Sequence, residues 1–140
     1  MQITSESDIF LFRDKDGRPK KFNKIQRQIY LDKTRNKVLV LHRRAGKTAY
    51  AVAKCLMATL QNVSHRYWIV APTYRQAKTI AWEMIKFMTR QFPVGMFKLR
   101  EDELSVECRQ TWSRLELKGS DNPDSLRGAG LNGLVLDEFQ

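Results

Sequence analysis

Apolar residues recur along this 140-residue chain with two different periods, and the two periods predict different elements. Short β-branched or alternating apolar runs predict strands, whereas apolar positions three or four residues apart predict amphipathic helices. Strands are expected at 38–41, 67–70, 104–108, 115–117 and 134–136, and helices at 23–33, 47–60 and 74–91. Residues 9–12 predict either a short strand or an apolar hook. Strands that alternate with helices favour an α/β domain with a mainly parallel sheet and helices covering it in three layers.

The length and composition suit one globular domain with a real core, because 42% of the residues are apolar. We expect a lead-in over residues 1–21 and one domain over 22–140. Cys55 and Cys108 lie inside apolar patterns and are expected to be reduced core thiols, and there are too few Cys and His for a zinc site. No apolar run reaches membrane-spanning length and no secretory signal opens the chain, which predicts a soluble cytoplasmic protein.

Positive charge is concentrated in the N-terminal third of the chain. The formal net charge is +10, and the segment Arg13–Arg44 contains 12 Lys or Arg against 3 Asp. Such an excess indicates contact with a polyanion, either nucleic acid or nucleotide phosphates. The alternative is a solvated basic face without a specific partner.

The stretch Val38–Thr48 begins as an apolar run, continues through a short basic loop and ends in Gly-Lys-Thr before the predicted helix. Strand, loop and helix in this order are the context of a phosphate-binding loop, or Walker A motif, in which Lys47 contacts phosphate and Thr48 ligates Mg²⁺. Leu41 stands where the usual G-x-x-x-x-G-K-[ST] pattern has its first glycine. The alternative is an ordinary strand-to-helix turn with a surface lysine.

Two acidic residues follow the last predicted strand, Leu134–Leu136. In open α/β sheets, ligands bind at the carboxyl ends of parallel strands. Asp137 would therefore hold Mg²⁺ and Glu138 would orient or deprotonate a water molecule, as in a Walker B motif. The alternative is a strand end with two solvated acids.

Gln26 and Gln28 lie on the helix that precedes the loop. A glutamine amide offers one donor side and one acceptor side, which matches the edge of adenine. An exposed surface amide is the alternative.

These segments, in this order and spacing, resemble the N-terminal ATPase domain of the large terminase subunit, the genome-packaging motor of tailed bacteriophages. The family's phosphate-binding loop is rich in arginine and often lacks the first glycine, which would explain Leu41. The resemblance covers about residues 20–140 and implies a P-loop fold of the helicase-like ATPase class. Its motifs are Ile25–Gln28, His42–Thr48, Ala71–Lys78, Ser125–Gly128 and Gly133–Glu138.

The resemblance implies a role for each matching residue. Lys47 and Thr48 would bind phosphate and Mg²⁺, Asp137 would complete the Mg²⁺ site, and Glu138 would be the catalytic carboxylate. Gln26 would contact adenine. The full set implied to bind ATP is Gln26, Arg43, Arg44, Ala45, Gly46, Lys47 and Thr48.

Three arginines have less defined roles. By resemblance, Arg43 or Arg44 would touch the γ-phosphate within the same subunit, and Arg127 would act as a finger on a neighbouring subunit. The loop around Arg127 also permits a local ion pair with Asp121 or Asp124.

The function implied is an ATP-hydrolysing motor that drives double-stranded DNA into a procapsid, in the cytoplasm of the infected bacterial host. Its implied partners are DNA, a portal protein, a small terminase subunit and further copies in a ring, with no membrane. The chain ends two residues after Glu138, so we expect a fragment without the family's coupling motif and nuclease domain. The alternatives are a catalytically silent nucleotide- or DNA-binding fragment and a helicase-like ATPase.

Overall fold

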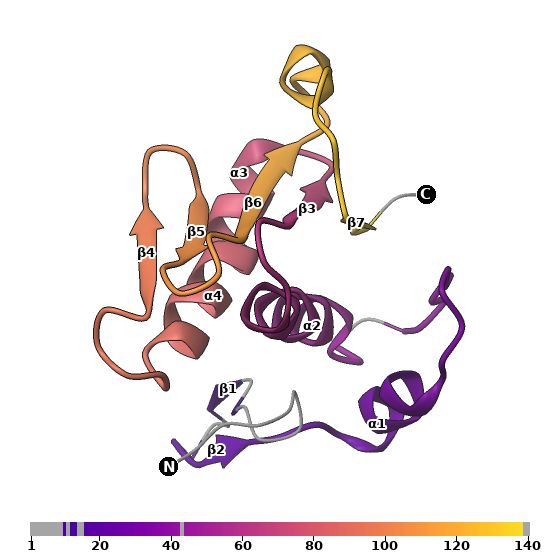
Figure 1. Cartoon of the computed structure of the whole chain (residues 1–140). Helices are drawn as coiled ribbons and strands as arrows, with labels where there is room; N and C mark the ends of the chain where they lie inside the picture. The colour runs from indigo at the N-terminus through magenta and orange to yellow at the C-terminus, as the bar shows by residue number, and fades with distance from the viewer. Residues whose placement is uncertain (1–9, 11, 14–15, 43, 139–140) are drawn as a thin grey trace.

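A five-stranded sheet, seen in Figure 1, forms the centre of the computed structural model, which describes residues 10, 12–13, 16–42 and 44–138. The strands occur in the order β4-β5-β6-β3-β7, and β3 is parallel to both of its neighbours, whereas β5 is antiparallel to both of its own. Their bounds are Arg66–Ala71 (β3), Phe97–Arg100 (β4), Ser105–Cys108 (β5), Arg114–Gly119 (β6) and Gly133–Leu136 (β7).

The sheet is therefore mixed, and the expectation of a mainly parallel sheet is wrong. Short turns join β4 to β5 and β5 to β6, and connections this short return the chain antiparallel. β4 was not predicted from the apolar pattern. The strands β3, β5, β6 and β7 were predicted to within a few residues.

The helices follow the predicted periodicity closely. α1 spans Lys24–Leu31, α2 spans Lys47–Gln61, and the third helix begins as α3, Tyr74–Gln76. That helix then passes through a π-helical turn, η2, Ala77–Ala81, and ends as α4, Trp82–Thr89. The remaining elements are a small ribbon of β1 (Phe12–Arg13) and β2 (Pro19–Lys20), and a 3₁₀ turn, η3 (Pro123–Leu126).

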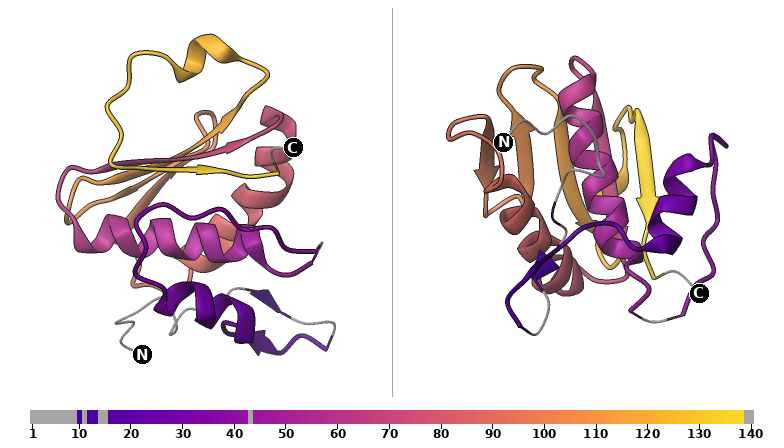
Figure 2. Two further views of the ribbon diagram at one scale, coloured as in Figure 1. Left: turned by 90° about the vertical axis from the view of Figure 1, so that its right-hand side faces the viewer. Right: turned by 90° about the horizontal axis from the view of Figure 1, so that it is seen from below.

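One hydrophobic core lies between a single face of the sheet and the helices. Residues of α2 and α4, such as Leu56 and Ile85, form a common buried cluster with Ile69 of β3 and Leu117 of β6. Figure 2 shows α2 and α4 on the same side of the sheet. The described residues thus form two layers, and the expected third layer is absent from this part of the chain. Cys55 and Cys108 are free and buried, and burial raises the pKa of the Cys55 thiol to about 12.

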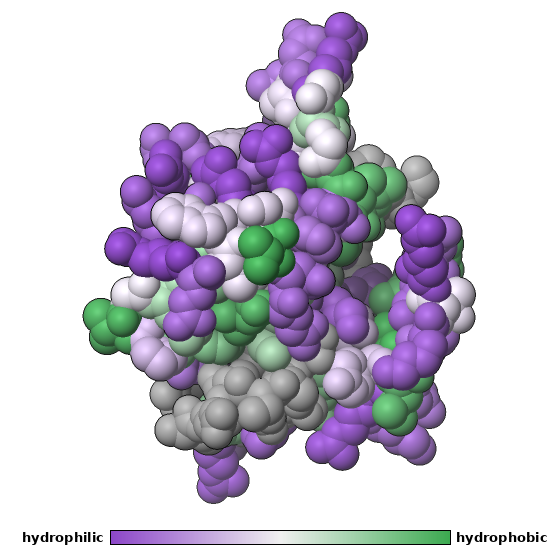
Figure 3. Space-filling view, in the orientation of Figure 1, coloured by the Kyte–Doolittle hydropathy of each residue, from purple (hydrophilic) through white to green (hydrophobic). Residues whose placement is uncertain are grey.

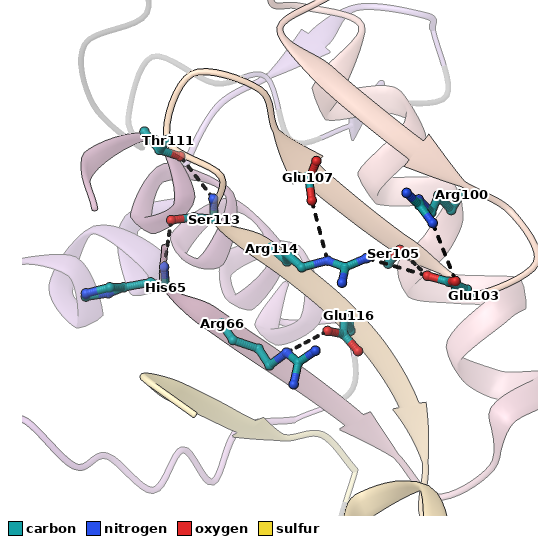
Figure 4. Close-up of polar contacts among 10 residues, drawn as sticks. All are labelled: His65, Arg66, Arg100, Glu103, Ser105, Glu107, Thr111, Ser113, Arg114 and Glu116. Atoms are coloured by element: carbon teal, nitrogen blue, oxygen red, sulfur yellow. Dashed lines mark hydrogen bonds and ion pairs between the residues drawn. The ribbon is translucent and has the colours of Figure 1, made fainter. Parts of the chain in front are cut away.

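The opposite face of the sheet carries a network of charged side chains, drawn in Figure 4. Arg66 of β3 lies 2.9 Å from Glu116 of β6, and Arg114 of β6 lies 3.5 Å from Glu103 and 3.8 Å from Glu107. Arg66, Arg114 and Glu116 alternate along β3 and β6 with residues of the core cluster, because successive side chains of a strand point to opposite faces. The charged face explains why no apolar helix stripe covers it within the described residues.

The segment 38–41 is not a strand, which corrects the prediction made from its apolar run. Val38 and Val40 are each 91% exposed, and the segment pairs with no strand among the described residues. Figure 3 shows a hollow between β7 and the chain that connects α1 to α2, with apolar surface on both sides. Strand formation requires a hydrogen-bonded neighbour, so β-propensity alone did not suffice here.

β7 was expected to be a buried parallel strand, and only half of that expectation holds. It is parallel to β3, but it lies at the edge of the sheet, with Leu134 and Leu136 53% and 58% exposed. Val135, between them, packs against the core. An edge strand covered on one face alone buries every second side chain.

Leu56 and Leu31 provide a matched test of this core. Leu56 of α2 is fully buried in the common cluster, whereas Leu31, the last residue of α1, is exposed. Leu56→Ala should lower the free energy of unfolding by about 2–5 kcal/mol, because it removes packed methyl groups and leaves a cavity. Leu31→Ala should change it by less than about 0.5 kcal/mol. Urea unfolding curves measure both, and equal effects of the two substitutions would contradict the assignment of the core.

Candidate functional site

A cavity of about 390 Å³ opens where the start of α2, the end of β3 and the end of β7 meet. One wall is the loop before α2 and the first turn of that helix. The opposite wall is apolar and comes from β3, from the loop after it and from the third helix. The lining residues are Arg44, Ala45, Gly46, Lys47, Thr48, Ala49, Ile69, Ala71, Pro72, Gln76, Ala77, Ile80, Ala81, Met84, Asp137 and Glu138.

A hydrogen bond joins the two motifs that the sequence placed at opposite ends of the chain. The Thr48 hydroxyl donates to Oδ2 of Asp137 at 2.7 Å, across 89 residues of sequence. Asp137 is held in place because its backbone N–H donates to the Val70 carbonyl at 2.9 Å, which extends the pairing of β7 with β3. The side chains expected to form a metal site are therefore in direct contact.

Lys47 is the first residue of α2, and its ammonium donates to the Leu41 carbonyl at 2.9 Å. The lysine thus bridges the two ends of the loop and lines the cavity. The N-cap of α2 is Gly46, with a backbone φ of 84°, and no described side chain caps the first turn. The first-turn N–H groups and the helix dipole therefore favour an anion at this end of α2.

Two non-glycine residues on the cavity wall have left-handed backbone conformations. Arg44 has a φ of 64° and Glu138 a φ of 60°, and both side chains are exposed. Each such residue costs roughly 1–2 kcal/mol. Strain of this kind concentrates at functional sites, where the surrounding structure maintains it. Arg43 lies outside the described residues.

Gln26 is buried behind the loop that precedes α2. The side chain is 1% exposed, and its Nε2 donates to the Gly46 carbonyl at 2.9 Å. Its Oε1 accepts a hydrogen bond from the backbone N–H of Asn23 at 2.8 Å. Both polar ends of the amide are thus engaged within the chain, and Gln26 lies behind the loop instead of lining the cavity. Gln28 is exposed on the same helix.

Arg127 is exposed, as its sequence context indicated, but it lies outside the cavity wall. Its guanidinium Nε is 3.6 Å from Oδ1 of Asp124, which is one of the two local pairings considered from the sequence. The other candidate, Asp121, instead accepts a hydrogen bond from the backbone N–H of Tyr74 at 3.0 Å. Figure 1 shows η3, which precedes Arg127, projecting away from the sheet.

The apolar wall of the cavity was not predicted from the sequence. Ala77, Ile80 and Met84 were assigned to one core-facing stripe, yet Ile80 is half exposed and both Ile80 and Met84 line the cavity. The π-helical turn at 77–81 inserts an extra residue into the helix and rotates its face. Single π turns of this kind often occur at functional sites. Ile80 and Met84 are apolar like the rest of the stripe, so the sequence pattern gives no signal that separates them from core positions.

The residues at the mouth of the cavity fit Mg²⁺. Mg²⁺ binds proteins through one or two oxygen ligands, usually a carboxylate, and completes its shell with phosphate oxygens and water. A hydroxyl and a carboxylate oxygen 2.7 Å apart, beside a helix N-terminus, are such a donor set. The described residues contain no group of three or more His, Cys, Asp or Glu that would form an all-protein metal site.

Comparison with known proteins places this chain in a family. Residues 38–140 match the family described as "Terminase large subunit, T4likevirus-type, N-terminal". The chain is 28% identical over 130 residues to the large terminase subunits of Thermus phage G20c and Thermus virus P23-45. In each case the match covers 81% of this chain and 27% of the relative, so the chain spans about a quarter of their length.

Solved structures agree with the sequence comparison. The large terminase ATPase domain of Thermus phage P74-26 is similar, with a TM-score of 0.70 and 26% identity. That match covers 84% of this chain and 53% of the solved domain. The family match extends over well over half of the chain and includes both the loop and the acidic strand end. The chain therefore belongs to the terminase large subunit family and corresponds to the N-terminal ATPase part of that subunit.

Proposed function

We propose that this chain carries the ATP-binding and ATP-hydrolysing site of a viral DNA-packaging motor. The observation that supports the proposal best is the hydrogen bond between Thr48 and Asp137. It joins the first turn of α2 to the carboxyl end of β7, in a cavity that also holds Lys47 and Glu138. Phosphoryl transfer requires hydrogen-bond donors to the phosphates, a metal site and a carboxylate that positions the attacking water, and this combination of groups matches those requirements.

The phosphate chain of ATP would bind at the N-terminus of α2. Backbone N–H groups of the loop and first turn would donate to its oxygens. The Lys47 ammonium would exchange the Leu41 carbonyl for the β- and γ-phosphate oxygens, which carry more negative charge. Thr48 and Asp137 would hold Mg²⁺, which neutralises phosphate charge when bound. In this arrangement the loop is a P-loop, or Walker A motif, and the end of β7 a Walker B motif.

Glu138 would act on the attacking water. Its exposed carboxylate lies on the cavity wall next to Asp137, so a water molecule between it and the γ-phosphate would be oriented for in-line attack. Arg44, on the same wall, would contact the γ-phosphate, and Arg43 remains a second candidate for this role. We retain Arg127 as a candidate finger for a neighbouring subunit.

The partners follow from the family as proposals for this chain. They are double-stranded DNA, a portal protein, a small terminase subunit and further copies of this subunit in a ring, within the cytoplasm of the infected bacterium. Among the described residues of the N-terminal third, nine exposed basic side chains are suited to contact phosphates: Arg18, Lys20, Lys21, Lys24, Arg27, Lys33, Arg35, Lys37 and Arg44. None of the described helices is long and apolar enough to cross a membrane.

A second candidate function is nucleotide binding without turnover. The chain spans only 53% of the solved ATPase domain, so residues beyond it could be needed for hydrolysis. Under this proposal the chain would bind ATP but would not release phosphate, with or without DNA.

Substitution of Lys47 and Glu138 tests the site directly. Lys47→Ala should abolish ATP binding, because it removes the ammonium that compensates phosphate charge. Glu138→Gln should leave binding intact and lower turnover by about 10²–10⁴-fold, the usual contribution of a general base. Fluorescent-nucleotide titration and phosphate release measure the two effects.

Glu83→Gln is the matched control, because Glu83 is an exposed glutamate on α4 that pairs with Lys86 away from the cavity. It should bind and hydrolyse ATP like the parent chain. Parental turnover by Glu138→Gln would exclude the catalytic role. If the parent binds ATP without turnover, the silent-fragment alternative is favoured.

DNA binding should depend strongly on salt and little on sequence. If about five of the exposed basic residues contact phosphates, the slope of log K against log[salt] should be near −4 to −5. Fluorescence anisotropy with two duplexes of unrelated sequence measures the slope. Joint replacement of Lys33, Arg35 and Lys37 by Gln should make the slope shallower.

The control replaces Arg90, Lys98 and Arg109 by Gln, which removes the same charge from exposed positions elsewhere on the chain. That variant should retain the parental slope. A flat salt response of the parent would mean that the basic segment is merely solvated.

The finger role of Arg127 is tested by mixing subunits of the assembled motor. If Arg127 acts on a neighbouring site, Arg127→Ala and Glu138→Gln subunits should each be inactive alone. Mixed rings should then recover part of the ATP turnover, at interfaces that join an intact arginine to an intact glutamate. A well-placed arginine finger contributes about 10³–10⁵ in rate. Parental turnover by Arg127→Ala alone would assign the residue to its ion pair with Asp124.

A further inference from the structure

Helix α1 meets the back of the loop before α2, on the side away from the cavity. Phe22 is buried just before α1, and its ring centroid lies 5.5 Å from that of Tyr50 in α2. This contact anchors the start of α1 beside the start of α2. The side chains of Asn23 and Gln26 consequently face the loop residues Ala45 and Gly46.

Two side-chain amides donate to two consecutive loop carbonyls. Nδ2 of Asn23 donates to the Ala45 carbonyl at 3.2 Å, and Nε2 of Gln26 donates to the Gly46 carbonyl at 2.9 Å. The packing is tight, because a Cβ on Gly46 would lie 2.4 Å from Nε2 of Gln26. We call these two hydrogen bonds the amide clamp.

The capping box of α1 determines which end of each amide faces the loop. Oδ1 of Asn23 accepts from the backbone N–H of Gln26 at 2.9 Å, and Oε1 of Gln26 accepts from the backbone N–H of Asn23 at 2.8 Å. Because both oxygens serve the helix cap, the nitrogens are left for the loop. Adenine recognition by Gln26 would require breaking two hydrogen bonds of a buried amide, and unpaired buried polar groups are costly.

The clamp also orients the peptide groups that face the cavity. In a planar trans peptide, C=O and N–H point in opposite directions. The Gly46 carbonyl also accepts the first helical hydrogen bond of α2, from the backbone N–H of Tyr50 at 3.0 Å, so the clamp and the helix hold it together. With the carbonyls of Ala45 and Gly46 held in this way, the N–H groups of Gly46 and Lys47 point to the opposite side of their peptide planes, toward the cavity that both residues line. These N–H groups are donors that a phosphate chain would use.

We propose that Asn23 and Gln26 are positioning residues, which act through the loop carbonyls to preorganise the phosphate-binding N–H groups, and that Gln26 does not recognise the base. This inference rests on the proposed binding of a nucleoside triphosphate at the loop. It implies that the clamp contributes equally to the binding of any ligand with the same phosphate chain.

Two substitutions remove the clamp and keep the helix cap. Asn23→Asp retains an N-cap oxygen but has no side-chain donor for the Ala45 carbonyl. Gln26→Glu retains an oxygen for the N–H of Asn23 but cannot donate to the Gly46 carbonyl. Gln28→Glu is the matched control, because Gln28 is exposed on the same helix and its substitution makes the same change of charge as Gln26→Glu.

The experiment measures the affinities of the chain for ATP, GTP and inorganic tripolyphosphate. Each clamp substitution should weaken all three in parallel, by about three- to tenfold, the usual effect of one lost hydrogen bond. Gln28→Glu should bind all three like the parent. A loss confined to ATP would show that Gln26 recognises adenine and would overturn the proposal, as would unchanged affinities in both clamp variants.

Amide hydrogen exchange of Ala45 and Tyr50 without ligand gives a readout that does not depend on nucleotide binding, because their N–H groups donate to the carbonyls of His42 and Gly46 at the loop. Exchange at these amides should be faster in both clamp variants than in the parent and in Gln28→Glu, while exchange in the core of α2 stays unchanged. Unchanged exchange at the loop would overturn the clamp. If the parent binds none of the three ligands while loop exchange rises as expected, the proposed function fails and the mechanical role of the clamp stands.

Discussion

The candidate site depends on the parallel pairing of β3 with β7. Val70 is in register with Leu136, and the next residue, Asp137, continues the ladder by donating to the Val70 carbonyl. This register places the Asp137 carboxylate beside the loop that follows β3. A slip of one residue would turn the carboxylate to the other face of the sheet, because side chains alternate along a strand.

The loop before α2 is held from two sides. On the cavity side, Thr48 contacts Asp137 and Lys47 contacts the Leu41 carbonyl. On the other side, the amides of Asn23 and Gln26 contact the next two carbonyls of the loop. The loop is therefore bound both to an N-terminal helix and to a strand near residue 137. A change at either support would be transmitted to the groups that we propose bind phosphate.

Local patterns predicted the elements whose stability is mostly local. The Asn23 cap, the start of α2 at Lys47 and the hairpin strands β5 and β6 follow from neighbouring residues, and all of them are present. The predictions that failed depended on partners distant in sequence. The apolar run 38–41 has no strand beside it in the described structure, β7 has a neighbour on one edge only, and the two long helices share one face of the sheet.

By itself, the sequence determined which chemical groups occur at the loop and at the strand end, because those groups are adjacent along the backbone. It also placed both motifs at element boundaries, since periodicity shows where a strand or helix begins. Only the tertiary structure decided that Thr48 and Asp137 touch, that Ile80 and Met84 line the cavity, and that Gln26 faces the loop. Tertiary packing decides which group a buried polar side chain bonds to. For Gln26 that group is the Gly46 carbonyl, 20 residues away in sequence.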